Sequence, residues 1–265
     1  MGRRGPRSRS FILNCVASLD PQEDWTIEDA SEAGLVDVSA SIPKSKDLRA
    51  AWWKIDHQEK TGACVGFATA AGVLRWHYVR SGLIQKSQNQ RPSPRFIWMA
   101  NKETDEITSY PTTFLDNEGT QTKRALGVAR RYGCVSDNIL PMNGRLSRLR
   151  SAAFYALAAR HRLTSYHNLG RNPDDWRRWV ATTGPILTRL DVDRTWDGAT
   201  DNRGKLTTYE SATVRGGHAV CLVGFTTKHF IVRNSWGSSW GDRGFAYASD
   251  AYAQDAFTEA YGAVI

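Results

Sequence analysis

Apolar residues recur at helical spacing through the first half of the chain. Beyond position 64 they stand at steps of four, three and four, which puts them on one face of a helix: Phe67, Ala71, Leu74 and Tyr78. Gly82 follows where a helix C-cap is expected. Further helices are predicted from Pro94, over residues 119–132 and over residues 146–160. The first half is therefore predicted to be mainly helical.

The pattern changes to strand-like runs in the second half. Residues 184–190 begin with Gly-Pro and are predicted to form a strand after a turn, and residues 217–225 form a nearly continuous apolar run. A short link joins this run to residues 229–234, its expected hairpin partner, and residues 244–248 make a further strand. Helices first and antiparallel strands second predict an α+β chain with two lobes and a site in the cleft between them.

The same patterns divide the chain into three parts. Residues 1–41 are polar and mixed with an acidic patch, and they favour a leader segment lying over the surface. Residues 42–160 are expected to form the helical lobe, and residues 161–265 the β lobe.

Composition is that of a globular protein, with 41% hydrophobic residues and ten Trp among 265 residues. No run approaches the ~18 apolar residues that a membrane span needs. The net charge is +8, and residues 123–178 hold 12 basic and 3 acidic residues. A solvated face is the favoured interpretation of this stretch. A nucleic-acid surface is the weaker alternative, since no KH, RNP or zinc-knuckle pattern accompanies it.

The four cysteines are far apart and form no CxxC pair: Cys15, Cys64, Cys134 and Cys221. Neither a disulfide-stapled domain nor a zinc site has this spacing, so we expect reduced thiols in a cytoplasm and no metal. Arginines before residues 11–17 imitate a short signal peptide, which leaves export as an alternative. Asn14 interrupts that apolar run, and no cleavage site follows it.

Cys64 is the first candidate for chemistry, because it stands at the predicted start of a helix. The partial positive charge of a helix N-terminus lowers the pKa of a thiol, and only the thiolate is a nucleophile. Taken alone, Cys64 is more simply explained as a small buried hydrophobic residue.

The hairpin supplies what a nucleophilic cysteine needs, a base and a group that orients the base. His218 lies on its first strand and Asn234 ends its second, so antiparallel pairing brings them together. Gln58 precedes Cys64 by six residues, and its amide is a candidate donor for a developing oxyanion.

These residues stand in motifs that together resemble the papain-like cysteine peptidases of bacterial type: Gln58 to Cys64, Gly217-His218-Ala219-Val220, and Asn234-Ser235-Trp236 with the Trp and Gly residues after it. The resemblance spans about residues 42–250 and implies a papain-like two-lobed fold. It implies Cys64 as nucleophile, His218 as base and then acid, and Asn234 as the group that orients His218. It also implies an oxyanion hole of Gln58 and the Cys64 amide.

Substrate contacts are implied by the same resemblance at Gly62, Gly119, Thr120, Gly217 and Trp236, and Trp236 would also shield the His218–Asn234 bond. Three positions depart from the family pattern. Thr61 and Val65 replace a Cys and a Trp beside the nucleophile, and Thr120 replaces a Gly of the substrate-binding pair. Subsite specificity is therefore not carried over.

The expected activity is that of a thiol protease that cleaves peptide or protein substrates through a thioester acyl-enzyme, with no cofactor. Other acyl transfer on the same residues remains an alternative, as amidase, isopeptidase or peptide ligase, and so does a non-catalytic regulatory or binding module. Residues 1–41 are too few for a typical inhibitory prodomain. Either the enzyme is constitutively active, or the leader or a separate regulatory protein restrains it. We hypothesise that residues 1–41 lie across the lobes and limit access.

Overall fold

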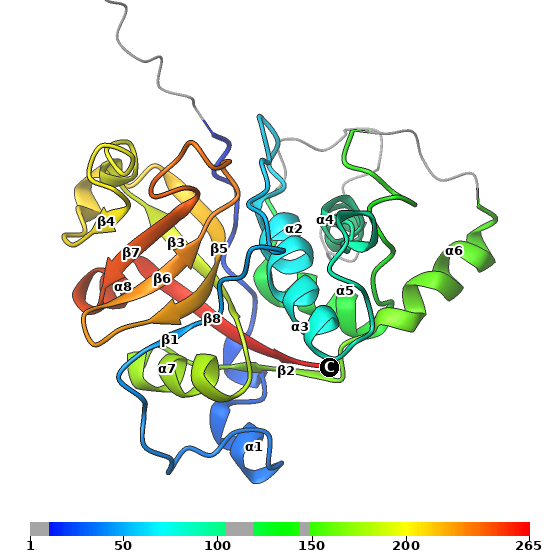
Figure 1. The fold of residues 1–265 in the computed structure, drawn as a ribbon, viewed down its shortest axis with the longest axis horizontal. Helices are drawn as coiled ribbons and strands as arrows, with labels where there is room; N and C mark the ends of the chain where they lie inside the picture. The colour runs from blue at the N-terminus through cyan, green and yellow to red at the C-terminus, as the bar shows by residue number, and fades with distance from the viewer. Residues whose placement is uncertain (1–10, 104–118, 144–148) are drawn as a thin grey trace, which may run out of the picture.

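The computed structural model describes residues 11–103, 119–143 and 149–265. Helices gather on one side of the molecule and a sheet on the other (Figure 1). The helical side holds α2 (Cys64–Gly66), α3 (Arg75–Arg80), α4 (Pro94–Glu103), α5 (Thr122–Arg131) and α6 (Ser151–Ala158). The predicted α+β class is confirmed, as are the predicted helices from Pro94 and over residues 119–132.

The helix that begins at Cys64 differs from its prediction. It runs unbroken from α2 through a π-helical segment (Phe67–Leu74) into α3, and every residue from Cys64 to Leu74 is buried. A helix buried on all sides is central, so the prediction of one apolar and one polar face is wrong here. Two glycines allow this packing, because a side chain at Gly66 would overlap the carbonyl of Pro94, and one at Gly72 would overlap the Cys221 sulfur.

The sheet runs in the order β2-β8-β3-β5-β6-β7-β4, with the short β1 on β5. Its strands are β1 (Lys46–Asp47), β2 (Ser165–Asn168), β3 (Ile186–Val192), β4 (Lys205–Leu206), β5 (Gly216–Phe225), β6 (His229–Arg233), β7 (Phe245–Ser249) and β8 (Phe257–Val264). Pairing is antiparallel except between β4 and β7. The predicted hairpin is confirmed as β5–β6, with a register shift between Leu222 and Gly224.

Three helices on the sheet side were not predicted: α1 (Ile27–Glu32), α7 (Pro173–Thr182) and α8 (Asp250–Ala256). β2 and β8 were also missed. The helix predicted over residues 146–160 is observed as α6 followed by a short 3₁₀ turn (Ala159–His161), and residues 146–148 lie outside the described residues.

The two sides have separate hydrophobic cores. One surrounds the central helix and α5, and the other lies between the sheet and the helices that pack on it. Ile27, Ala30 and Val36 belong to the second core. The prediction of a leader lying only over the surface is therefore wrong for this part, because these side chains are buried.

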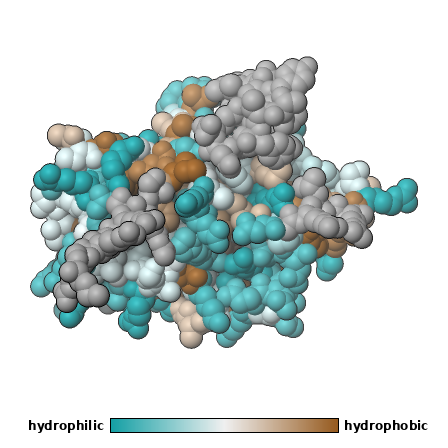
Figure 2. All heavy atoms as spheres, turned by 90° about the horizontal axis from the view of Figure 1, so that it is seen from above, coloured by the Kyte–Doolittle hydropathy of each residue, from teal (hydrophilic) through white to brown (hydrophobic). Residues whose placement is uncertain are grey.

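The surface seen from above is largely hydrophilic, with apolar residues in small patches (Figure 2). Of the helices that the structure describes, none combines the length and the hydrophobicity that crossing a membrane requires.

Candidate active site

Cys64 lies where the central helix meets the sheet. It is the first residue of α2, directly after Ala63, and its side chain is fully buried. The backbone N–H of Ala219 on β5 hydrogen-bonds its sulfur. The nucleophile candidate from one side of the molecule therefore contacts the strand that carries His218.

His218 is held between Cys64 and Asn234. Its Nε2 lies 2.8 Å from Asn234 Oδ1, and the backbone N–H of Ser235 donates to the same oxygen at 2.8 Å. An oxygen that accepts from Ser235 also accepts from His218, so Nε2 carries the proton. The other nitrogen, Nδ1, is buried on the side of Cys64 and is free to take a proton from the thiol.

Aromatic rings cover the His218–Asn234 pair. The ring centroids of Trp236 and His218 are 4.8 Å apart. Trp196 meets the His218 ring edge-on, with centroids 5.8 Å apart. Trp240 packs against both tryptophans, at 5.4 Å from Trp236 and 4.9 Å from Trp196. Water is thereby kept from the imidazole–amide bond. Trp196 was not predicted, because it comes from a loop 22 residues before His218 with no local signal.

Gln58 is buried beside the same pair but points its donor elsewhere. Its Oε1 accepts from Ser235 Oγ at 2.7 Å, and its backbone N–H donates to the Ser235 carbonyl at 2.8 Å. Its Nε2 donates to the Thr61 carbonyl at 2.9 Å. The amide predicted to face an oxyanion thus has a backbone partner in this structure.

The surroundings of Cys64 favour its thiolate. A hydrogen bond from the Cys15 thiol lowers the pKa of Cys64 well below its usual range. Contacts with His218 and the Ala219 N–H lower it further, against the effect of burial. Burial raises the pKa of Cys15, and so does its contact with Cys64. Of these two thiols, Cys64 is the one that ionises.

Residues 11–19 of the leader, here called the inserted segment, run between the helical side and the sheet (Figure 1). The Cys15 N–H donates to the Gly217 carbonyl at 3.0 Å, and the Val16 N–H donates to the Thr120 carbonyl at 3.0 Å. The Thr120 N–H donates to the Asn14 carbonyl at 3.2 Å. The hypothesis that the leader crosses between the lobes is confirmed for these residues.

The inserted segment touches each residue that was predicted to bind substrate. Besides the backbone bonds of Gly217 and Thr120, the Asn14 side chain packs on Gly62, and Val16 packs on Gly119 so closely that a side chain at Gly119 would overlap it. Phe11 stacks on Trp236, with centroids 4.2 Å apart and planes 2° apart. The five positions therefore line one surface, and the chain's own N-terminal segment occupies it.

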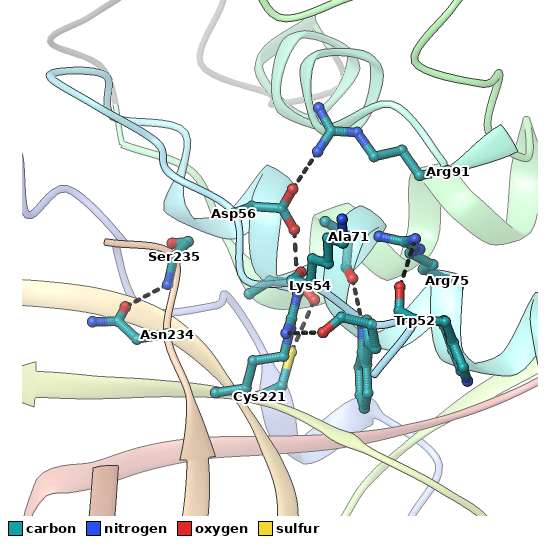
Figure 3. A network of polar contacts seen from close by, with 12 residues as sticks. Trp52, Lys54, Asp56, Ala71, Arg75, Arg91, Cys221, Asn234 and Ser235 are labelled. Atoms are coloured by element: carbon teal, nitrogen blue, oxygen red, sulfur yellow. Dashed lines mark hydrogen bonds and ion pairs between the residues drawn. The ribbon is translucent and has the colours of Figure 1, made fainter. Parts of the chain in front are cut away.

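A buried ionic network holds residues 52–58 against the end of β6 (Figure 3). Asp56 pairs with Arg233 at 3.2 Å and also pairs with Arg91. Arg233 donates to the carbonyls of Trp53 at 3.0 Å and Lys54 at 2.5 Å. The network fixes Gln58 and Asn234 relative to each other. It was not predicted, and its one sequence signal is a charged residue at the end of an apolar strand.

Several side chains of the basic stretch have partners within the fold. Lys123 pairs with Asp24 at 2.7 Å, Arg177 with Asp250 at 2.5 Å, and Arg130 stacks over Trp25 and Tyr166. Within the described residues, no group of three or more His, Cys, Asp and Glu side chains could hold a metal ion.

Comparisons of sequence and structure show which known proteins the chain is similar to. A model of the papain family of cysteine proteases matches residues 42–260. Fruit bromelain of Ananas comosus is 25% identical over 231 residues, which cover 79% of this chain and 55% of bromelain. Cathepsin K of Mus musculus is 24% identical over 212 residues, 77% of this chain and 59% of the cathepsin. The chain thus spans little more than half the length of these relatives.

The fold is also that of a solved bacterial enzyme. The crystal structure of xylellain, a cysteine protease from Xylella fastidiosa, superposes with a TM-score of 0.76 at 19% identity, over 100% of this chain and 98% of that one. The papain-like two-sided architecture expected from the sequence is confirmed by this likeness.

Proposed function

Because the chain belongs to the papain family of cysteine proteases, we propose that it hydrolyses peptide bonds with Cys64 as nucleophile, His218 as base and acid, and Asn234 as the residue that orients His218. The observation that carries this proposal is the buried line of contacts from Asn234 through His218 to Cys64, with the Nδ1 of His218 facing the thiol.

The chemistry proceeds in two halves. Proton transfer from Cys64 to His218 Nδ1 leaves a thiolate, which attacks the carbonyl carbon of the scissile bond. His218 then gives its proton to the amine as the C–N bond breaks, and an acyl thioester remains on Cys64. Water attacks the thioester, His218 takes the water's proton, and breakage of the C–S bond releases the acid and the thiolate.

Gln58 has the position to stabilise the oxyanion once it changes partner. In this structure its Oε1 accepts from Ser235 Oγ and its Nε2 donates to the Thr61 carbonyl. A change in the side-chain torsions of Gln58 would move Nε2 from that carbonyl to a substrate oxygen. Loss of an oxyanion donor lowers kcat by about 10²–10³-fold. Gln58→Ala is therefore expected to lower kcat by that factor, while Gln58→Glu separates the loss of the donor from the loss of packing.

The inserted segment supports a resting state in which the site is closed to substrate. It occupies the backbone groups of Thr120 and Gly217 that a bound peptide would need, and it covers Trp236. The leader then acts as the enzyme's own restraint. Four free cysteines support a reducing compartment, such as a cytoplasm, as the place of action.

A thiol-directed peptide probe tests the catalytic assignment. The reduced protein is incubated with a peptide vinyl sulfone, and the labelled residue is identified by mass spectrometry. We expect labelling at Cys64, loss of it in Cys64→Ala and strong slowing in His218→Ala. Cys134→Ala is the matched control, since it removes a buried thiol that donates to the Ser93 carbonyl, away from the site. Labelling that persists in Cys64→Ala contradicts the proposal.

A further inference from the structure

Cys15 is a second thiol at the site, and the proposed hydrolysis does not use it. It is 2% exposed and lies in the same buried cluster as Cys64, which is fully buried, and the two side chains interact. Both thiols are held by the start of β5, because the Cys15 N–H donates to the Gly217 carbonyl and the Ala219 N–H bonds the Cys64 sulfur.

The backbone around Cys15 is fixed on both sides. The Val16 N–H donates to the Thr120 carbonyl at 3.0 Å, and Arg189 Nε donates to the Cys15 carbonyl at 3.0 Å. Arg189 is itself bound to Asp191 at 2.9 Å. These contacts fix the position of Cys15, and so they hold its thiol beside Cys64.

The other two cysteines have different surroundings. Cys134 Sγ donates to the carbonyls of Val135 at 3.4 Å and Ser93 at 3.7 Å, and Cys221 Sγ donates to the Ala68 carbonyl at 3.0 Å. Burial raises the pKa of both thiols, that of Cys221 to about 12. They serve as internal controls, because their sulfurs bond to backbone carbonyls and not to another thiol.

We propose that Cys15 and Cys64 form a reversible disulfide, which locks the inserted segment across the active site when the protein meets a peroxide. The proposal rests on the proposed function only for its effect on activity, because the bond itself can be measured without any substrate. Cys64 is the thiol that peroxide oxidises, and Cys15 is the thiol that then forms the disulfide with the oxidised Cys64.

The reaction balances in two steps. The Cys64 thiolate attacks one oxygen of hydrogen peroxide, the O–O bond breaks, and Cys64 sulfenic acid and hydroxide form, the latter taking up a proton as water. The Cys15 sulfur then attacks the Cys64 sulfur, the S–O bond breaks, and the hydroxyl leaves as water with the Cys15 proton. Two thiols are oxidised to one disulfide, and one peroxide is reduced to two waters.

Such a bond both closes and protects the enzyme. A sulfenic acid left alone is oxidised further to sulfinic acid, which cellular thiols do not reverse. Capture by Cys15 ends the oxidation at the disulfide, and a dithiol reductant restores both sulfurs. The same event changes a noncovalent block of the site into a covalent one.

The experiment uses the full chain, reduced and then treated with limiting hydrogen peroxide. Free thiols are counted in denaturant, and the disulfide is identified by mass spectrometry of non-reduced peptides. We expect the count to fall from four to two and the peptide containing Cys15 to be joined to the peptide containing Cys64. Labelling of Cys64 by the peptide probe should be lost and then regained with dithiothreitol.

Two variants sharpen the result. In Cys15→Ser, which keeps the size and the backbone contacts, peroxide should oxidise Cys64 to sulfinic acid, and dithiothreitol should not restore labelling. Cys134→Ala should form the disulfide and recover as the unchanged protein does. Sulfinic acid on Cys64 at equal rates in the unchanged protein and in Cys15→Ser overturns the proposal, as does a disulfide that joins other cysteines.

Failure of the proposed function has a different signature. If Cys64 is not the catalytic residue, the reduced protein does not label with the peptide probe, yet the thiol count and the joined peptides still report on the disulfide. If the disulfide does not form, labelling of the reduced protein is unaffected.

Discussion

The N-terminal segment has two halves that the rest of the chain holds in different ways. The anchor segment, residues 26–36, places Ile27, Ala30 and Val36 in the core, each at most 5% exposed. The inserted segment is held by backbone hydrogen bonds and by polar side-chain contacts such as those of Ser18 with Glu259, and its Val16 and Leu19 are 42% and 48% exposed.

The two kinds of contact contribute different free energies to the stability of the fold. Burial of an apolar side chain contributes about 1.5–3 kcal/mol, whereas one hydrogen bond contributes about 0.5–1.5 kcal/mol net. Each contact of the inserted segment is therefore weaker than each buried side chain of the anchor segment, and we expect the inserted segment to be released first. The sequence alone does not show this difference between the two segments, since both belong to one continuous leader.

The largest effect is expected from the anchor segment. Ile27→Ala removes a buried side chain of the core and should lower the free energy of unfolding by about 2–4 kcal/mol. Urea denaturation followed by tryptophan fluorescence measures it. Leu19→Ala is the control in the inserted segment and should change stability by less than about 0.5 kcal/mol. Equal losses in the two variants would remove the distinction between the halves.

Loosening the inserted segment should change activity more than stability. Phe11→Ala combined with Val16→Pro removes the stack on Trp236 and the donor to Thr120. Together these contribute about 1–3 kcal/mol, so the open fraction should rise about fivefold to 160-fold. The initial rate of probe labelling under reducing conditions measures it.

Val16→Ala is the matched control for that experiment, because it keeps the backbone donor. Its labelling rate should stay near that of the unchanged chain. An unchanged rate in the double variant would show that the segment does not limit access.

A smaller effect is expected at the start of the anchor segment. Thr26 and Asp29 form a capping box at α1, in which the Asp29 side chain accepts from the Thr26 N–H at 2.6 Å. Thr26→Ala should lower the free energy of unfolding by about 1 kcal/mol, and Thr26→Ser should retain most of it. Thermal unfolding of the three proteins tests this. A loss in Thr26→Ser equal to that in Thr26→Ala would mean that the cap contributes nothing.

The smallest expected effect is a shift in pH dependence. Among the contacts that lower the pKa of Cys64, that with Cys15 has the largest effect, and that with His218 comes next. Glu259 and Arg189 act on Cys15 with opposite signs. In Cys15→Ala the pKa of Cys64 should rise, so the midpoint of alkylation by iodoacetamide should move to higher pH. Cys134→Ala should leave the midpoint in place, and a shift to lower pH in Cys15→Ala would contradict the assigned cause.

Local patterns were sufficient for the hairpin and the start of the central helix. Alternation and apolar runs placed β5 and β6, and the pairing of Cys221 with Arg233 brings Asn234 to His218 as expected. α7 could also have been predicted. Asn172 caps it, Pro173 begins it, and Trp176 and Trp179 stand three apart on its buried face.

Contacts between distant segments could not be predicted in the same way. Trp196 over His218 and the contact of Cys15 with Cys64 depend on how loops and the leader cross the finished fold. The ion pairs of Asp56 with Arg91 and Arg233 likewise join three segments that are far apart in the sequence. The π-helical turn is a tertiary effect too, because burial on every side replaces the amphipathic pattern that sequence analysis relies on.

Since the anchor segment stays in the core, an inserted segment that leaves the site remains tied to it by a few residues. A tether of this length keeps the local concentration of the segment in the millimolar range. Closing is then a first-order event, whose extent does not change when the protein is diluted. A peptide substrate competes with that local concentration and not with the amount of enzyme, so the leader raises the substrate concentration at which half of the sites are occupied.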